Sequence, residues 1–447
     1  MNISAVRKQP LIALFKEDIA DLLLLGHTYE IIFLPVHEKI GNTYTVLLEV
    51  FSAIPIEDPW SRQFKLSGEI QISSGIYEIY KDRLLSPWSF VLTLAYLIGG
   101  KVTPPGTYHK LKIGLLLSLV SESKRLHILV AGSDMEFPRR LLCHCAELAP
   151  RHVLYNSGTR LVGDTRDKFF IDAGLVHLAH NGICYMGNLT TCKVMDEVRI
   201  LIESNTVTSP HLKHDTAIVQ PLTTAIWAHL DVKSLKCKPS SDRITHTYKI
   251  KSLVDLFGMV FYVETEDGSA DHTLDAIITK HSLDSASNGS NGFIPIETVH
   301  QRDFATFLQQ VRSRKLEFQP MATRMIRQYF LSSRFVRQAT TNGAEIPQSA
   351  LPTLLKLAEN HAKIALHLTV TEDDSLMACY LYEESLASQY GYSHLDVIPS
   401  PNIVDGTLGE ILGKGNDLKM RQFQEKLIRF TGEFGGEDAT FVSGWEE

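Results

Sequence analysis

The sequence predicts a mixed α/β protein built around a mostly parallel β-sheet. Five short, nearly continuous apolar runs follow one another between residues 126 and 265, and polar turns or helical spacing separate them. Runs of this kind are typical of parallel strands that are buried on both faces. The predicted strands are 127-HILVAG-132, 152-HVLYNS-157, 182-GICYMG-187, 223-TTAIWAHL-230 and 259-MVFYVE-264.

The bulk composition is that of an ordinary globular protein. The 447 residues are 44% hydrophobic and 21% charged, which allows about two or three domains with buried cores. A net charge of −7 gives no global attraction to nucleic acid, so any DNA contact depends on a local basic patch. The six cysteines form no C-x-x-C pair, which favours reduced thiols in a cytosolic or nuclear protein. We find neither a signal-peptide pattern nor about 18 consecutive apolar residues, so no membrane span is expected.

The segments before the sheet are predicted to be a small β unit followed by helices. Residues 10–55 alternate between turns and runs rich in β-branched and aromatic residues, which indicates strands. Residues 86–123 are predicted to be helical, with a break at 103-TPPG-106. Within the sheet region, 192-CKVMDEVRILIES-204 has helical spacing of its apolar residues.

The C-terminal part is predicted to be a linker followed by helices. The segment 282-SLDSASNGSNGF-293 is rich in serine, asparagine and glycine, which favours a flexible linker. Helical patterns then continue to about residue 391, and 371-TEDD-374 is a plausible cap at the start of the last predicted helix. The acidic, glycine-rich tail from residue 432 is expected to be frayed.

Several motifs resemble the minichromosome maintenance (MCM) helicase family. The segment 171-IDAGLVHLAHNGICYMGNL-189 is similar, without a gap, to the family pattern A-G-A-L-V-L-A-D-x-G-I-C-C-I-D-E-F. Further on, 357-LAENHAKIAL-366 resembles the family pattern L-S-E-A-H-A-R-M-x-L. The T-E-D-D stretch that follows it is similar to the family's T-x-E-D-V. Residues 102–120 and 380–391 look like one divergent, meiotic member of the family. The resemblance covers most of the chain.

This resemblance implies an AAA+-like, P-loop NTPase-type fold. It places a partial OB-fold-like β segment at 1–58, a helical connector at 59–100 and the α/β core at 101–281. A linker at 282–293, a helical lid at 294–392 and a partly disordered C-terminal extension at 393–447 complete the expected plan. The family's N-terminal helical subdomain and zinc ribbon are expected to have no counterpart here.

The phosphate loop of the family is replaced in this sequence. The family pattern G-D-P-G-x-[AS]-K-S aligns with 132-GSDMEFPR-139, so Pro138 stands at the lysine position and Arg139 at the serine that binds Mg²⁺. Proline also removes a backbone N–H from a loop that donates such groups to phosphate, and Glu136 adds negative charge. An ordinary strand–helix turn is therefore favoured over a phosphate site. Weak binding of an anion by Arg139 and Arg140 stays open as the alternative.

The other ATPase elements are replaced as well. The Walker B sequence I-D-E-F becomes 186-MGNL-189, so neither Gly187 nor Asn188 can hold Mg²⁺ or activate water. Sensor 1 falls at or near Asp231, the arginine-finger position is Leu256, and the sensor 2 arginine position is Ser349. Joint loss of five elements predicts a pseudo-ATPase with no catalytic residue and no cofactor.

Binding to DNA is the chemistry that the sequence leaves possible. The hairpin that carries a DNA-facing lysine in the family aligns with 207-VTSPHLKH-214, and a second basic segment spans 312–337. A solvated loop for the first and a solvated face or protein interface for the second are the competing interpretations. The candidate residues are His211, Lys213, Arg312, Arg314, Lys315, Arg324 and Arg327.

Metal binding is not predicted. In 143-CHC-145 the one-residue spacing on a helix directs the side chains to different faces. The acidic segment 264-ETEDGSADH-272 lacks the ligand spacing of a calcium loop.

The resemblance implies a nuclear, non-catalytic protein of meiotic recombination. It is expected to support double-strand break repair and homologue pairing as a subunit or scaffold of a complex with other MCM-like proteins. The alternative is a DNA helicase subunit in a mixed ring whose ATPase activity comes from its partners. An active subunit with non-standard residues is opposed by Pro138, Gly187 and Asn188.

Overall fold

The chain forms two compact units, Met1–Glu69 and Ile70–Glu447. The computed structural model describes residues 11–16, 18–21, 23–40, 43–56, 72–82, 86–122, 125–167, 170–209, 218–232, 256–263, 272–287, 301–338, 346–390, 392–399, 402–403 and 411–434. In this part of the chain, no helix is both long and apolar enough to cross a membrane.

The described part of the first unit is a small β-sheet. Strand β3 (Thr43–Pro55) lies in the middle, pairing in parallel with β1 (Ile12–Phe15) and antiparallel with β2 (Tyr29–Ile40). A short helix, α1 (Asp18–Asp21), follows β1. The β unit predicted for residues 10–55 is therefore confirmed.

The second unit is built on a parallel sheet, and all five predicted strands belong to it. Its strands are β4 (Ile128–Gly132), β5 (His152–Leu154), β8 (Ile183–Asn188), β11 (Ala225–Asp231) and β12 (Met259–Tyr262). Their order is β12-β4-β11-β8-β5, and each neighbouring pair is parallel. The mixed α/β fold with a parallel sheet is thus confirmed.

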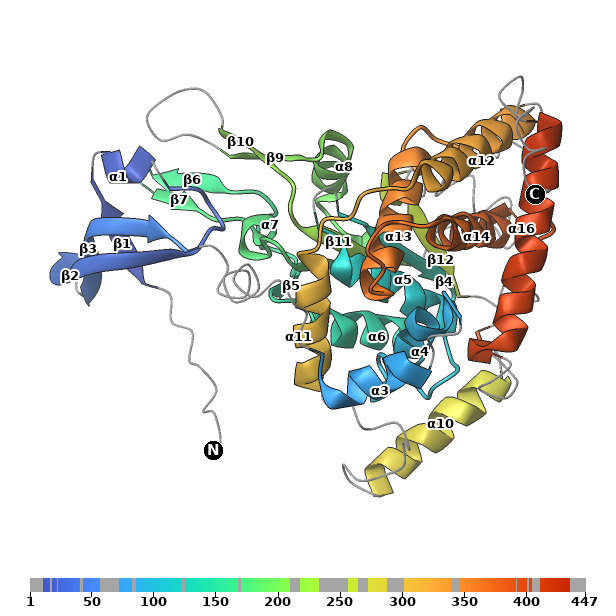
Figure 1. Cartoon of the computed structure of the whole chain (residues 1–447). Coiled ribbons are helices and arrows are strands. Elements are labelled where there is room, and N and C mark those ends of the chain that lie inside the picture. Colours follow the sequence, from blue (N-terminus) through green and yellow to red (C-terminus); the bar gives the residue numbers. More distant parts are fainter. Residues whose placement is uncertain are drawn as a thin grey trace. The chain divides into compact units, whose positions relative to one another are not determined.

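Alternate residues of the strands enter two separate hydrophobic cores. Ile128 and Val130 pack into the first core with α4 (Ser89–Leu97), α5 (His109–Val120) and α6 (Glu136–Ala146). Leu129 and Ala131 pack into the second core with α7 (Leu175–Leu178) and α8 (Met195–Ser204). Burial on both faces is the reason that these strands read as continuous apolar runs. Figure 1 shows the sheet between these groups of helices.

Short polar elements extend from the sheet region. The antiparallel pairs are β6 (Asp164–Asp167) with β7 (Phe170–Asp172) and β9 (Thr206–Ser209) with β10 (Ile218–Pro221). A single 3₁₀ turn, η1 (Leu189–Thr191), directly follows β8.

The remaining helices join the first hydrophobic core. They are α3 (Ser74–Asp82), α10 (His272–Ser287), α11 (Gln301–Arg312), α12 (Pro320–Gln338), α13 (Ala350–Ile364), α14 (Glu372–Tyr390) and α16 (Lys414–Phe434). Buried residues of α11 to α14 and of α16 share one cluster with α4, α5 and the sheet. The predicted cap of α14 is confirmed, because the backbone N–H and hydroxyl of Thr371 each donate to Asp374 Oδ2 at 2.8 Å.

One C-terminal prediction needs correction, and a helix that was not predicted follows further on. The predicted linker 282–293 begins inside α10, whose last residue is Ser287. The Ser282 hydroxyl donates to the Ile278 carbonyl at 2.9 Å within this helix, so the serine-rich composition does not end it there. The extension 393–447, expected to be partly disordered, contains the long helix α16, because Met420, Phe423, Leu427 and Phe430 recur at helical spacing and are buried.

Candidate functional site

The replaced phosphate loop forms a compact turn between β4 and α6. The Asp134 carboxylate accepts a hydrogen bond from the backbone N–H of Glu136 at 3.2 Å, at the first residue of α6. A side chain of the loop itself therefore takes a donor that a phosphate loop would offer to its ligand.

Apolar side chains fill the space above the end of β4. A Cβ atom added at Gly132 would lie 2.7 Å from Cγ2 of Val263 and 3.3 Å from Sδ of Met135. Met135 is buried, and so is Pro138, the residue at the lysine position. A phosphate group at this loop would find neither a lysine nor the N–H that proline lacks.

The two arginines after the loop already have partners at the surface. Arg139 Nη2 lies 3.2 Å from the Glu136 carboxylate, and both side chains are about half exposed. The Arg140 guanidinium lies 5.8 Å from the centre of the Phe137 ring. The positive charge that Arg139 brings to this turn is therefore largely offset by Glu136, one helical turn away.

The Walker B positions have a local structure that suits their present residues. Gly187 has a φ of +72°, a conformation that an aspartate adopts only with strain. The Asn188 side-chain oxygen accepts from the N–H and the hydroxyl of Thr190 at 3.1 and 2.9 Å. Asn188 thus caps η1, which is a structural role.

Strand register brings these positions to one edge of the sheet. Asp231, the predicted sensor 1 position, pairs with Gly132, and His229 pairs with Asn188. This is the carboxyl edge, where parallel α/β sheets hold their ligands. By contrast, Leu256 packs against the second hydrophobic core, and Ser349 precedes α13, where its carbonyl accepts from the Thr353 hydroxyl at 2.9 Å.

A buried tyrosine–histidine pair lies at this edge and has no signature in the sequence. The Tyr185 hydroxyl lies 2.7 Å from His229 Nδ1, and the two rings are stacked with centroids 5.9 Å apart. Burial, together with the charge of Arg139, lowers the pKa of His229 to about 4, and burial raises the pKa of Tyr185. Both groups are therefore neutral at pH 7, and the imidazole is a poor proton acceptor for catalysis.

The basic candidates for DNA contact divide into two groups. Arg312 Nη1 donates to the Asn181 carbonyl at 2.6 Å. Arg314 donates to the carbonyls of Lys363 and His367 at 3.1 and 2.5 Å, so both guanidinium groups connect parts of the fold. Lys315 and Arg327 are exposed and Arg324 is half-buried. His211 and Lys213 lie outside the described residues.

Two other residues of the basic segment 312–337 are buried. The Tyr329 hydroxyl donates to Glu383 Oε2 at 2.6 Å. Arg337 Nη2 pairs with Glu383 Oε1 at 2.8 Å, and both side chains are 1% exposed. These groups connect α12 with α14, which leaves fewer charges on the surface than the sequence suggested.

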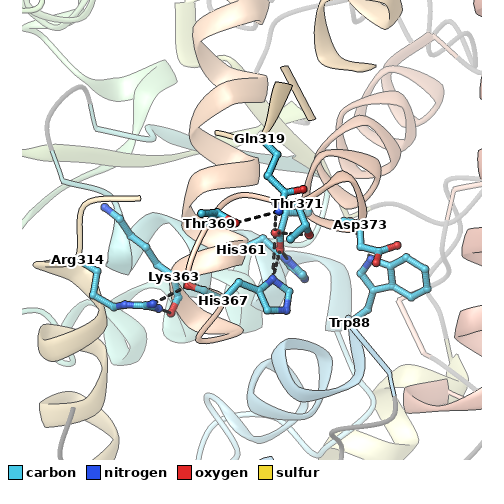
Figure 2. A network of polar contacts seen from close by, with 10 residues as sticks. Trp88, Arg314, Gln319, His361, Lys363, His367, Thr369, Thr371 and Asp373 are labelled. Carbon is cyan, nitrogen blue, oxygen red and sulfur yellow. Dashed lines mark hydrogen bonds and ion pairs between the residues drawn. The ribbon is translucent and has the colours of Figure 1, made fainter. Parts of the chain in front are cut away.

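A polar network around Asp374 joins α13 and α14 to their neighbours (Figure 2). The buried carboxylate lies 2.6 Å from His361 Nδ1 and 3.0 Å from His367 Nδ1. Burial alone would raise the pKa of Asp374, but the hydrogen bonds from the two histidines outweigh it and lower the pKa. At the preceding residue, the Asp373 carbonyl accepts a hydrogen bond from Trp88 Nε1 at 2.9 Å. The network connects the end of α13 to the start of α14.

Metal ligands are not gathered in the described part of the chain. No group of three or more histidine, cysteine, aspartate or glutamate side chains there could hold a metal ion. Cys143 and Cys145 are both free thiols, and burial raises the pKa of each.

The parallel sheet, its two helical layers and the loop positions at its carboxyl edge define an α/β protein compatible with an MCM-like AAA+ fold. Comparison with known proteins agrees. The chain is 28% identical to the human (Homo sapiens) minichromosome maintenance domain-containing protein 2 over 474 aligned residues, covering 99% of this chain and 67% of the relative. The mouse (Mus musculus) protein of that name is 27% identical over 98% of this chain and 66% of its own length.

A more distant MCM protein also matches. The minichromosome maintenance protein MCM of Saccharolobus solfataricus is 25% identical over 75% of this chain and 51% of its own length. No family model matches the chain. The predicted resemblance is confirmed: the chain is similar to minichromosome maintenance domain-containing protein 2 over nearly its whole length, and it spans about two thirds of the length of the mammalian relatives.

Proposed function

We propose that this chain is a pseudo-ATPase with an MCM-like AAA+ core, acting by assembly and not by hydrolysis. Helices α11 to α14 would be the lid, and the sheet of the first unit would be a partial OB-fold-like segment. One observation carries the proposal: the lysine, the Mg²⁺ ligands and the general base are replaced together at one edge of the sheet. The residues present there are Pro138, Arg139, Gly187 and Asn188.

The chemistry of these residues supports the proposal. Phosphoryl transfer to water depends on positioning the phosphates and on neutralising charge through lysine and Mg²⁺. The Asn188 oxygen is engaged by Thr190, and Asp134 occupies the first donor of α6. A nucleotide held loosely by Arg139 would still lack metal and base, so weak binding would not lead to turnover.

The biological role proposed is support of meiotic recombination in the nucleus, including double-strand break repair and homologue pairing. The resemblance of residues 102–120 and 380–391 to a meiotic MCM-like protein supports it. Similarity to an MCM protein suggests hetero-oligomeric association with other MCM-like proteins. The chain would then supply a fixed structural element to the assembly.

A replacement experiment in meiotic cells tests this role. Loss of the chain should reduce break repair and homologue pairing, and an otherwise intact chain with Arg139→Ala and Asp231→Ala should restore both. These changes remove two charged groups of the edge that could contact a nucleotide, and Arg139 contributes only an exposed ion pair to the fold. Failure of this variant to restore function, although it accumulates normally, would favour a nucleotide-dependent subunit.

For DNA, the proposed contacts are the exposed Lys315, which precedes α12, and the exposed Arg327 on α12, with Arg324 one turn before Arg327. Changing Lys315 and Arg327 together to alanine should flatten the salt dependence of DNA binding by roughly two in logarithmic slope, about one for each phosphate contact. Arg312→Ala with Arg314→Ala is the matched control, because those side chains bond to backbone carbonyls. An unchanged slope in the first pair would leave this surface as a solvated face or a protein interface.

A further inference from the structure

Helix α16 connects parts of the second unit that are far apart in the sequence. Its apolar stripe, Met420, Phe423, Leu427 and Phe430, is buried in the first hydrophobic core. Helices α12 and α14 are its neighbours there, as Figure 1 also shows. On the same side, the Lys419 ammonium lies 5.0 Å from the centre of the Tyr380 ring of α14.

The first turns of α16 bind a different element, the start of α4. The Ser86 hydroxyl donates to Asp417 Oδ1 at 2.6 Å, and the Ser89 hydroxyl bonds to the Leu412 carbonyl. The Arg421 guanidinium lies 5.0 Å from the centre of the Trp88 ring. Ser89 is the first residue of α4, and Ser86 and Trp88 directly precede this helix, which packs with the sheet.

Arg421 and Trp88 also reach the start of α14. Arg421 Nη1 lies 3.2 Å from Asp373 Oδ1, and Trp88 Nε1 donates to the Asp373 carbonyl at 2.9 Å (Figure 2). One residue pair thus joins α4, α14 and α16. Asp373 precedes Asp374, so this contact continues into the histidine network between α13 and α14.

Other bonds connect the same helices directly to the sheet region. The Ser385 hydroxyl of α14 donates to the Val260 carbonyl of β12 at 2.7 Å. Lys110 of α5 donates to the Ser388 hydroxyl at 2.6 Å and lies 3.7 Å from Glu384. Arg312 reaches the Asn181 carbonyl at 2.6 Å. Because these groups are buried or partly buried, moving α14 away from the sheet would leave several of them without partners.

In enzymes that close over a nucleotide, a lid moves relative to the core as the ligand changes. We propose that α16 is an intramolecular clamp that holds α12 to α14 against α4 and the sheet in one arrangement, independent of nucleotide. The inference rests on the proposed loss of ATP chemistry and extends it. The surface offered to partners by these helices would then be constant.

Amide hydrogen exchange on the full chain, followed by mass spectrometry, tests the clamp. Wild-type exchange in 86–97 and 372–390 should be the same with and without Mg²⁺–ATP. Changing Asp417 and Arg421 to alanine should speed exchange at the starts of α4 and α14 by roughly fivefold or more, with strands β4 and β11 unaffected. Arg429→Ala, an exposed position on the same helix, is the control and should change neither segment.

Two results would overturn the clamp. One is a change of the exchange rate in α12 to α14 when Mg²⁺–ATP is added to the wild-type chain. This measurement does not depend on the folding of any variant. The other is exchange in the Asp417 and Arg421 variant equal to that in the Arg429 control. ATP hydrolysis without a change in exchange would refute the pseudo-ATPase and leave the clamp intact, so the two failures are distinguishable.

Discussion

The buried ion pair between α12 and α14 makes a quantitative prediction. Glu383 accepts from Arg337 at 2.8 Å, from the Tyr329 hydroxyl at 2.6 Å and from the Ser393 hydroxyl at 2.8 Å. Burial would lower the pKa of Arg337, but the Glu383 carboxylate outweighs this and raises it, so the guanidinium stays charged. Glu383→Gln therefore leaves a buried positive charge without its counter-ion and should cost about 3–5 kcal/mol of unfolding free energy.

Urea unfolding followed by tryptophan fluorescence measures this loss, because Trp88 and Trp227 are both fully buried. Removing both charges, with Glu383→Leu and Arg337→Met, should cost much less than the sum of the single changes. Glu203→Gln, in an exposed pair with Arg199, is the control and should leave the midpoint unchanged. A Glu383→Gln midpoint equal to that of the control would refute the buried pair.

Two further predictions concern burial elsewhere in the second unit. His127 Nδ1 accepts from the Ile226 N–H at 3.0 Å, and burial lowers its pKa to about 4 from an ordinary 6.5. The folded state requires the neutral imidazole. The contribution of His127 to the unfolding free energy is therefore complete above pH 6.5, and it falls by about 3 kcal/mol as the pH drops to 4. His127→Asn keeps an acceptor and should remove this part of the pH dependence in urea unfolding at pH 7 and pH 5; an unchanged slope would contradict the assignment. Gly182→Ala would place Cβ 1.9 Å from the Arg151 carbonyl oxygen and should lower the unfolding free energy by about 3 kcal/mol or more. Gly432→Ala, with nothing within 4 Å, should be neutral or slightly stabilising, and equal melting temperatures for the two variants would count against the close approach.

The sheet was predictable because its strands are buried on both faces, which produces continuous apolar runs that a sequence displays directly. The hairpins β6–β7 and β9–β10 are too short to show such a pattern, and only the family resemblance of residues 207–214 indicated the second one. Helix α16 was missed for another reason. Its apolar residues are spaced among many charges, and this dilutes the signal although the helical period is present.

The sequence indicated which residues stand at the phosphate-loop and Walker B positions, and parallel register brings them to one edge. It could not indicate that Met135 and Val263 fill that space, because the two lie on different strand ends. The partners of Arg312 and Arg314 were equally hidden, since a backbone carbonyl distant in the chain carries no residue-type signature.

Hydrolysis of Mg²⁺–ATP by the purified full chain tests the central claim most directly. With Pro138 and Arg139 in the loop and Gly187 and Asn188 at the metal and base positions, we expect phosphate release equal to the background without protein. Turnover above background that disappears when a residue within 132–139 is changed would contradict the pseudo-ATPase account.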